Sequence, residues 1–150
     1  MIITFCGHSE IVSNDNLEEK VFDILLSKIN DTSVEFYLGG YGAFDNIAYK
    51  VCKRYKKINN LAKLYFITPY LSDVYLKNKM ELSEYDDSIY PELEHIPKKF
   101  AINERNKWMI EQSDLLIAFV NYPFGGAVKS LHYAIKLNKN YLNIGTYQPK

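Results

Sequence analysis

Three glycines in four positions follow a short apolar run and come just before a helical pattern, in the stretch Leu38–Asp45. Because glycine has no Cβ, the backbone at such a turn can adopt positive φ, and a ligand can approach the amides closely. A helix that begins just beyond the turn adds unpaired N–H groups and the positive end of its dipole. Gly39, Gly40 and Gly42 therefore indicate a phosphate or nucleotide site, and the alternative is a tight strand-to-helix turn without a ligand.

Glycine or polar residues also stand where three other apolar runs end. These residues are Gly7 and His8, then Thr68, Pro69 and Tyr70, and finally Gly125 and Gly126. In a parallel α/β sheet the carboxyl ends of the strands meet at one edge, where ligands bind. Both glycine turns lead into predicted helices, whose first amides favour anions. We therefore expect these residues to converge on a site for a phosphate-bearing small molecule.

Two charged side chains and one histidine are placed to contact such a ligand. Arg105 lies on a predicted helix, and its guanidinium can form a bidentate pair with a phosphate; the alternative is a structural ion pair with Glu104 or Asp114. Asp45 lies in the first turn of the helix after the glycines, where it either caps amides or binds ribose hydroxyls. His8 either hydrogen-bonds the ligand or is simply solvated.

Hydrophobic periodicity predicts the elements that would position these residues. Strands are expected at residues 2–6, 34–38, 61–67, 115–120 and 141–144, and helices at 17–29, 74–79, 102–112 and 127–137, with one more whose buried stripe runs from Ile47 to Tyr55. Asn16 and Glu19 resemble a capping box. Because the central strands are continuously apolar, the sheet is expected to be covered on both faces. The predicted fold is α/β: a Rossmann-like three-layer domain with a mostly parallel sheet of about five strands.

A long connection from Leu71 to Phe100 separates the third and fourth predicted strands, and its periodicity is weak. A connection of this length inside a compact domain is more often a lid or a binding loop than idle chain. The 150 residues are the size of one domain, so we predict a single domain over residues 1–150.

Composition argues against several classes of protein. The chain has 18 basic and 18 acidic residues, so its net charge of zero provides no global field for nucleic acid or an anionic membrane. Cys6 and Cys52 lack metal-ligand spacing and are expected to be buried thiols in a reducing compartment. His95 and His132 also lack partners at metal-ligand spacing, so neither a metal nor a cofactor is expected. Met1 leads directly into a strand without signal-peptide features, which predicts a cytoplasmic location and no membrane span.

Four motifs occur in order along the chain: Phe5-Cys6-Gly7-His8, Gly39 to Asp45, Arg105-Asn106 with Met109, and Gly125-Gly126 with Tyr133-Ala134. They resemble those of the SLOG group of Rossmann-like domains, and are most similar to its YpsA-like branch. The group also includes the LOG-type nucleotide phosphoribohydrolases and the DNA-processing protein DprA. The resemblance implies a nucleotide site to which Asn106, Ala127 and Ser130 also contribute.

Two positions depart from the pattern of the group. Ala127 stands where a threonine usually follows the glycine pair, which removes one hydroxyl donor to a phosphate. Ser130 stands where LOG enzymes and nucleoside deoxyribosyltransferases have a glutamate, and a shift of one helical turn offers only His132. Neither side chain supplies the negative charge that cleavage of an N-glycosidic bond needs. The resemblance therefore implies nucleotide binding more strongly than catalysis, and no catalytic residue is predicted.

Three functions are consistent with these patterns. The first is sensing or sequestering a nucleotide or nucleotide-derived signal, as in bacterial and phage conflict systems, with output through homo-oligomerisation or a protein partner. The second is an N-glycosidase or phosphoribohydrolase acting on a nucleoside monophosphate, with another acid (Glu10, Asp86, Asp87 or Glu104) in place of the missing glutamate. The third is single-stranded DNA binding, which the likeness to the DprA glycine motif favours and the neutral charge opposes.

Overall fold

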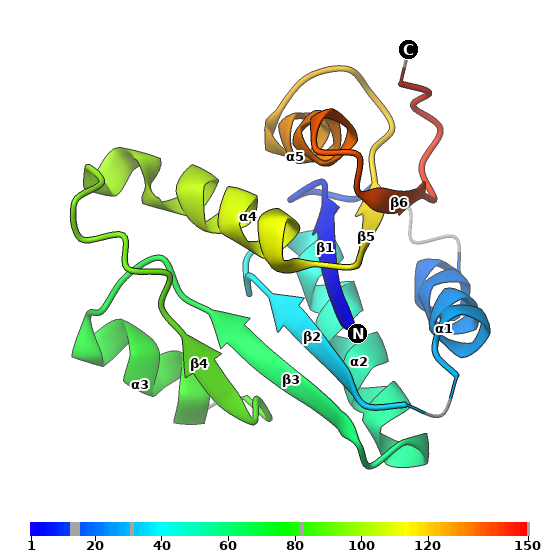
Figure 1. Ribbon diagram of the computed structural model, residues 1–150, viewed down its shortest axis with the longest axis horizontal. Helices are drawn as coiled ribbons and strands as arrows, with labels where there is room; N and C mark the ends of the chain where they lie inside the picture. The colour runs from blue at the N-terminus through cyan, green and yellow to red at the C-terminus, as the bar shows by residue number, and fades with distance from the viewer. Residues whose placement is uncertain (13–15, 31, 82, 150) are drawn as a thin grey trace.

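Six parallel strands form one sheet in this computed structural model, which describes residues 1–12, 16–30, 32–81 and 83–149. The strands are β1 (Ile2–Gly7), β2 (Val34–Leu38), β3 (Ala62–Ile67), β4 (Asp87–Ile89), β5 (Leu115–Phe119) and β6 (Asn140–Asn143). The helices are α1 (Leu17–Lys28), α2 (Ala43–Ile58), α3 (Asp73–Glu81), α4 (Ala101–Gln112) and α5 (Gly126–Lys136), with a 3-10 turn, η1, at Lys98–Phe100. The sheet lies between two layers of helices (Figure 1), which confirms the predicted three-layer α/β architecture.

The strand order β4-β3-β2-β1-β5-β6 reverses direction at the centre of the sheet. From β1 the chain adds β2, β3 and β4 on one side, then returns to pair β5 with β1 and β6 with β5. Gly7, the last residue of β1, is in register with Phe119, the last residue of β5. In sheets of this kind the ligand crevice lies where the order reverses, at the carboxyl ends of the strands. The turns that follow β1 and β5 are therefore neighbours at that position.

Alternation along the strands sends successive side chains to opposite faces of the sheet. Ile3 and Phe5 of β1 join α1 and α2 in the larger hydrophobic core. Thr4 faces the other way, with its Oγ1 3.7 Å from Met109 Sδ of α4, and Leu116 of β5 packs with α5 on that same face. Helices α1 and α2 thus cover one face and α4 and α5 the other, which leaves the strand ends of the upper edge in Figure 1 bordered by helices on both sides.

The sixth strand lies within the long connection from Leu71 to Phe100. The short helix predicted there is confirmed as α3, but β4 has only three residues and pairs with the edge of β3. A three-residue strand offers too few positions for a period of two to be visible. Asp86, just before β4, accepts hydrogen bonds from the Leu64 amide and from Lys56 Nζ, so this carboxylate is held against β3 and α2.

The capping box predicted at Asn16 and Glu19 is wrong. Asn16 has φ 61°, and its side chain makes no capping hydrogen bond to α1. An N-cap side chain reaches the first amides from a β-region backbone, and the left-handed backbone of Asn16 directs it elsewhere. Glu19 instead pairs with Arg54 of α2 at 2.6 Å.

Candidate functional site

Arg105 is buried at the carboxyl edge of the sheet, with only 3% of its surface exposed. Its Nη1 donates to the carbonyl oxygens of Gly39, at 3.0 Å, and Ile67, at 2.8 Å. Its Nε donates to Asn106 Oδ1 at 2.9 Å. The guanidinium therefore joins the ends of β2 and β3 to α4, and only Nη2 is left without an acceptor among the described residues.

The alternative role predicted for Arg105, an ion pair with Glu104 or Asp114, is wrong. Glu104 pairs with Lys107 at 3.4 Å, one helical turn along α4. Asp114 accepts a hydrogen bond from the Ile2 amide at 2.7 Å. The burial of Arg105 is therefore compensated by backbone carbonyls and the Asn106 side chain, and not by Glu104 or Asp114.

Arg105 Nη2 faces the carboxylate of Asp45 across a small gap. Both Nη2 and Asp45 Oδ2 lie 3.2 Å from the position that a Cβ on Gly39 would occupy. None of the ion pairs within 4.0 Å among the described residues joins the two groups directly. Asp45 and Arg105 also line a cavity of about 70 Å³, together with Cys6 and Ser130. Any side chain at position 39 would therefore contact both the guanidinium of Arg105 and the carboxylate of Asp45.

The first glycine turn is largely filled by its own chain. Gly42 has φ 95°, and a Cβ on it would lie 2.9 Å from Ser9 Cα. The first two amides of α2, those of Ala43 and Phe44, donate to the carbonyl oxygens of Ser9, at 2.8 Å, and His8, at 3.3 Å. Two amides at the start of α2, where the sequence indicates a phosphate site, are therefore already paired with the loop after β1.

The second glycine turn is open. Gly125 has φ 97°, and a Cβ on Gly125 or Gly126 would meet no atom within 4 Å. The amides of Gly126, Ala127 and Val128, at the start of α5, have no acceptor among the described residues. Unpaired amides at a helix start are suited to an anion. Of the two glycine turns, only this one leaves the first three amides of its helix without an acceptor among the described residues.

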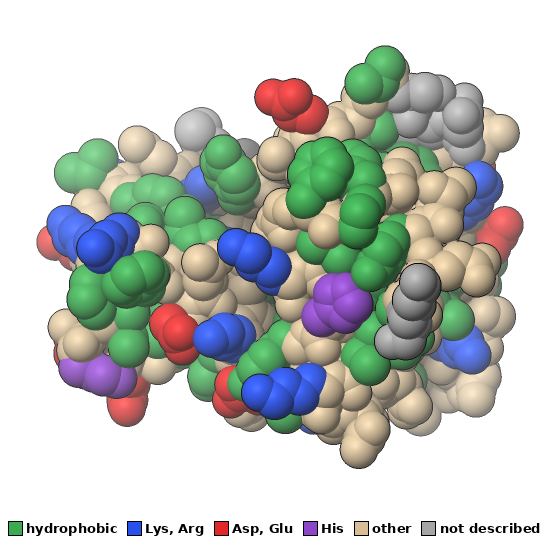
Figure 2. Space-filling view, turned by 90° about the horizontal axis from the view of Figure 1, so that it is seen from above, with side chains coloured by type: hydrophobic (Ala, Val, Ile, Leu, Met, Phe, Trp, Pro, Cys, Tyr) green, Lys and Arg blue, Asp and Glu red, His purple; other side chains and the backbone are tan. Residues whose placement is uncertain are grey.

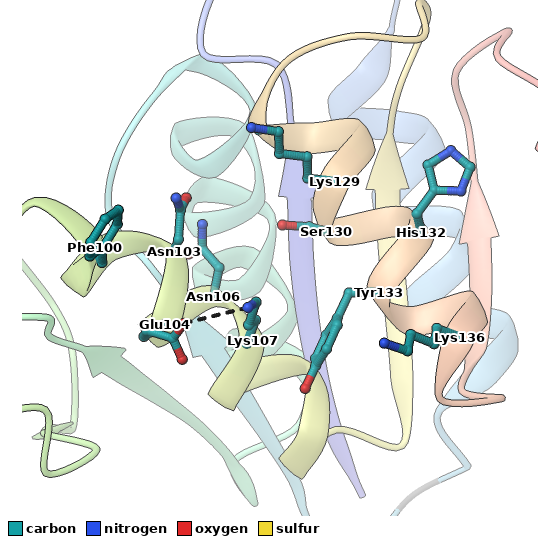
Figure 3. Close-up of a pocket in the computed structure, with 11 residues that line it drawn as sticks. Phe100, Asn103, Glu104, Asn106, Lys107, Lys129, Ser130, His132, Tyr133 and Lys136 are labelled. Atoms are coloured by element: carbon teal, nitrogen blue, oxygen red, sulfur yellow. Dashed lines mark hydrogen bonds and ion pairs between the residues drawn. The ribbon is translucent and has the colours of Figure 1, made fainter. Parts of the chain in front are cut away.

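A groove of about 420 Å³ runs between α4 and α5 and adjoins the smaller cavity, since Asn106, Gly126 and Ser130 line both. Figure 3 shows the Ser130 hydroxyl pointing from α5 towards Asn103 and Asn106 on α4. The Ser130 side chain has no hydrogen-bond partner among the described residues, although only 9% of the residue is exposed. A volume of this size falls within the range of about 300–1,000 Å³ that is usual for small-molecule sites.

Positive charge surrounds this groove. Lys107 of α4 and Lys129 and Lys136 of α5 line it, and its one lining carboxylate, Glu104, is the partner of Lys107 (dashed line in Figure 3). Figure 2 looks down on the carboxyl edge of the sheet and shows Lys and Arg side chains between two groups of hydrophobic side chains. The chain is neutral as a whole, but the groove favours an anionic ligand.

The residues predicted after β3 line a different hollow. Pro69 and Tyr70 border a groove of about 510 Å³ together with Tyr75 of α3 and Leu93. Thr68 Oγ1 donates to the Tyr70 carbonyl at 2.7 Å, which shapes the turn itself. These three predicted site residues are therefore not brought to the cavity that Asp45 and Arg105 line.

His8 joins the turn after β1 to the turn after β5. The residue is buried, its Nε2 accepts a hydrogen bond from the Asn121 amide at 2.8 Å, and its ring stacks on Tyr122 with centroids 3.9 Å apart. Burial lowers the pKa of the imidazole, in keeping with a neutral ring whose Nε2 is an acceptor. The alternative of a solvated histidine is therefore wrong.

The electrostatics of the small cavity centre on Asp45. Burial raises the pKa of its carboxyl to about 6, against the opposing effects of the Tyr41 amide, Arg105 and Lys79. Burial, together with the nearby Asp45, also raises the pKa of the Cys6 thiol well above its usual range. A partly buried carboxyl with a raised pKa beside a buried arginine is typical of functional sites more than of packing.

Sequence reasoning missed four side chains near the candidate site: Lys107, Lys129 and Tyr133, which line the groove, and Lys79, which contacts the first glycine turn. Lysines on helices are ordinarily solvated, and nothing in their spacing marks these three. The one available signal was the position of Lys129, in the first turn of the helix that follows Gly125 and Gly126. Lys79 was beyond prediction because it comes from the weakly patterned connection, where it donates to the Gly40 carbonyl at 2.7 Å.

Comparison with known proteins supports the fold. No protein-family model matches the sequence, and no curated protein matches it significantly. A solved structure that is similar in fold is the X-ray structure of TM1055, a structural-genomics target, with a TM-score of 0.56 and 12% sequence identity over 93% of this chain and 71% of that chain. At this identity the match shows a Rossmann-like fold, while membership of the SLOG group stays a prediction from the sequence motifs.

Two further observations concern only the described parts of the chain. None of the helices there is both long and apolar enough to cross a lipid bilayer. Within the same residues, no three His, Cys, Asp or Glu side chains gather in a way that would hold a metal ion.

Proposed function

We propose that this protein binds a nucleotide or nucleotide-derived small molecule at the carboxyl edge of its sheet. The observation that carries the proposal is the meeting of the open Gly125–Gly126 turn with the groove between α4 and α5. Unpaired amides at the start of α5 suit a phosphate, and the adjoining groove of about 420 Å³ has room for the rest of a nucleotide.

Charge supports the same assignment. Lys129 lies in the first turn of α5, beside the unpaired amides, and Lys107 of α4 lines the same groove. Two ammonium groups and a helix dipole together favour an anion more than either does alone. Ser130 Oγ and the Asn106 amide, both on the wall shared by the two cavities, add hydrogen-bonding groups for the uncharged part of the ligand.

The two glycine turns have different roles in this proposal. The phosphate is placed at the second turn, because the first has already given two helix amides to the His8 and Ser9 carbonyls. The first turn contributes through Asp45, whose carboxyl lines the small cavity beside Arg105.

Hydrolysis of an N-glycosidic bond is a second candidate, and one observation favours it. Asp45 lines the same small cavity as Ser130, the position at which related enzymes carry a glutamate, and its carboxyl has a pKa of about 6. A carboxylate there can stabilise the positive charge that develops on the sugar. Of the acids proposed to replace the glutamate, Asp86 is engaged by Lys56 and the Leu64 amide. Release of free base from nucleoside monophosphates, followed by chromatography, tests this candidate.

The binding proposal is tested with thermal-shift and calorimetric titrations against nucleoside mono-, di- and triphosphates and cyclic nucleotides. A ligand that binds only the folded state at a hundred times its dissociation constant adds about 2.7 kcal/mol to the free energy of unfolding. Gly126→Ala is the informative variant, since its Cβ enters open space at the turn and leaves the fold intact. Lys129→Ala removes the adjacent charge, and Lys63→Ala, an exposed position on β3, is its matched control.

We expect binding that Gly126→Ala and Lys129→Ala weaken by about tenfold and that Lys63→Ala leaves unchanged. Absence of binding by every nucleotide would reject the proposal. Output through homo-oligomerisation, also proposed, is tested by light scattering with and without the ligand, and a constant mass would count against it.

A further inference from the structure

The cavity between Arg105 and Asp45 has a size that limits what can enter it. Its volume is about 70 Å³. This volume admits small polar groups such as hydroxyls, and it is far below the range of about 300–1,000 Å³ that is usual for the site of a whole ligand. It opens onto the wall of the larger groove at Asn106 and Ser130, so a ligand seated in the groove can extend a small part of itself into it.

The two polar groups that face each other in this cavity have complementary chemistry. Arg105 Nη2 has no acceptor among the described residues, although only 3% of the residue is exposed. Asp45 Oδ2 is an acceptor that already takes the Tyr41 amide at 3.1 Å and has a second lone pair left. A hydroxyl group both donates and accepts, so it satisfies the carboxylate and the guanidinium at once.

Other small ligands fit these groups less well. A phosphate oxygen would meet the like charge of the ionised Asp45 carboxylate. A metal cation would meet the Arg105 guanidinium, and among the described residues no cluster of metal ligands surrounds Asp45. An apolar group would cover the Nη2 donor without giving it an acceptor, which is unfavourable.

We propose that this cavity is a ribose-hydroxyl subsite, in which Asp45 accepts from and Arg105 Nη2 donates to the neighbouring 2′- and 3′-hydroxyls of a ribonucleotide. The inference rests on the proposed nucleotide site and narrows its ligand to the ribo series. Carboxylates serve this purpose in other Rossmann-type folds, where they accept hydrogen bonds from ribose hydroxyls. In this protein the carboxylate comes from the first turn of α2, and Gly39 keeps the space beside it free.

The test compares sugars and holds everything else constant. AMP, GMP, CMP and UMP are titrated calorimetrically alongside their 2′-deoxy and 3′-deoxy forms, and ribose 5-phosphate alongside 2-deoxyribose 5-phosphate. Hydrogen bonds to charged groups contribute about 1.5–3 kcal/mol, and 1.4 kcal/mol is a factor of ten in affinity. We therefore expect each ribo compound that binds to bind about 10- to 100-fold more tightly than its deoxy counterpart.

Two variants act on the subsite from different sides. Asp45→Asn removes the charged acceptor, and Gly39→Ala places a methyl group 3.2 Å from both Arg105 Nη2 and Asp45 Oδ2, inside the gap. Asp23→Asn, at an exposed position of α1, is the matched control for the charge change. Thermal unfolding of each variant establishes that it is folded before it is titrated.

The outcomes separate the subsite from the function on which it rests. A preference for ribo compounds that Asp45→Asn and Gly39→Ala both reduce, and Asp23→Asn retains, supports the subsite, and a preference that neither variant changes overturns it. Equal binding of ribo and deoxy compounds by the wild type overturns the subsite and leaves the nucleotide site standing. Binding by neither series overturns both.

Discussion

Arg105 Nη1 lies 2.8 Å from the carbonyl oxygen of Ile67 and donates a hydrogen bond to it. A side chain of α4 thus binds the last residue of β3, which lies 38 residues earlier in the chain. The same nitrogen donates to the Gly39 carbonyl at 3.0 Å. One buried guanidinium thus supplies a donor to two strand ends, where the sheet ladder has finished and the loops diverge. Its position at the candidate site depends on these two bonds as much as on α4.

Arg105→Met should therefore destabilise the protein by about 2–6 kcal/mol, because a buried carbonyl left unsatisfied costs about 1–3 kcal/mol and two are affected. Chemical denaturation followed by tryptophan fluorescence measures the change. Arg54→Met is the natural control, since Arg54 is half-exposed and pairs with Glu19 at the surface. Surface pairs contribute about 0–1 kcal/mol, so equal losses in the two variants would contradict the role assigned to Arg105.

The fold was predictable because its signals are local and repeated. Predominantly apolar runs mark β1, β2, β3 and β5, and the two glycine turns follow β2 and β5 as expected. Sequence patterns fail where a strand is too short to show periodicity, or where the backbone conformation of one residue prevents the cap that its side chain favours. Strand β4 has three residues, and the left-handed backbone at Asn16 removes a cap that its side chain would otherwise make.

The candidate site was predictable in its parts and not in its arrangement. Residue types placed Arg105, Asp45 and both glycine turns at one edge of the sheet, and the structure brings Asp45, Arg105, Gly126 and Ser130 to one cavity. Which turn is open depends on where the loop after β1 runs, since its carbonyls take the amides of α2. That contact is between distant segments, and no local pattern in the sequence reports it.

His8 should make the stability of the protein fall on acidification. Burial lowers its folded-state pKa below the unfolded value of about 6.5, so its contribution is complete above that pH and is lost as pH falls through the folded-state pKa. Protonation also removes the Nε2 acceptor for the Asn121 amide, a bond worth about 0.5–1.5 kcal/mol.

Thermal unfolding of wild type and His8→Gln between pH 7 and pH 5 checks this expectation. The glutamine amide oxygen can accept from Asn121 without titrating, so the variant should lose less stability over the interval. Parallel curves for the two proteins would show that His8 does not titrate in this range. Glu10 and Lys20, which line the hollow beside His8, are present in both proteins and cancel in the comparison.

Lys79 should hold α3 against the first glycine turn. Its Nζ donates to the Gly40 carbonyl at 2.7 Å and lies 5.8 Å from the Phe66 ring centroid, whereas no residue of α3 is fully buried. Lys79→Met removes a charged donor worth about 1.5 kcal/mol or more, so amide exchange in α3 should become about tenfold faster. Hydrogen-exchange mass spectrometry measures it, with Lys77→Met on the exposed side of α3 as control. Unchanged exchange in Lys79→Met would mean that other contacts hold the helix.

Asp45 should reduce the stability of the ligand-free protein at neutral pH. Its carboxyl has a folded-state pKa of about 6 against about 3.9 when unfolded, so its contribution is fully present below pH 3.9 and is lost as pH rises through 6. Asp45→Asn, which keeps an acceptor for the Tyr41 amide, should therefore be more stable than wild type by about 1–3 kcal/mol at pH 8. The difference should shrink towards pH 4.

The same titration should govern the ligand. Above pH 6 the ionised carboxylate accepts from ribose hydroxyls, and binding that uses this form strengthens as pH rises through the pKa of Asp45. The Tyr41 amide, Arg105 and Lys79 lower the pKa of that carboxyl, and Cys6 and Tyr85, whose own pKa values Asp45 raises, are neutral near it. Denaturation and ribonucleotide titrations of wild type, Asp45→Asn and Asp23→Asn at pH 5 and pH 8 measure both effects. If Asp45→Asn is more stable than wild type at pH 8 and its ribose preference is weaker, the carboxyl destabilises the free protein and contributes to ligand binding. A stability difference that does not depend on pH would show that Asp45 is not the titrating group.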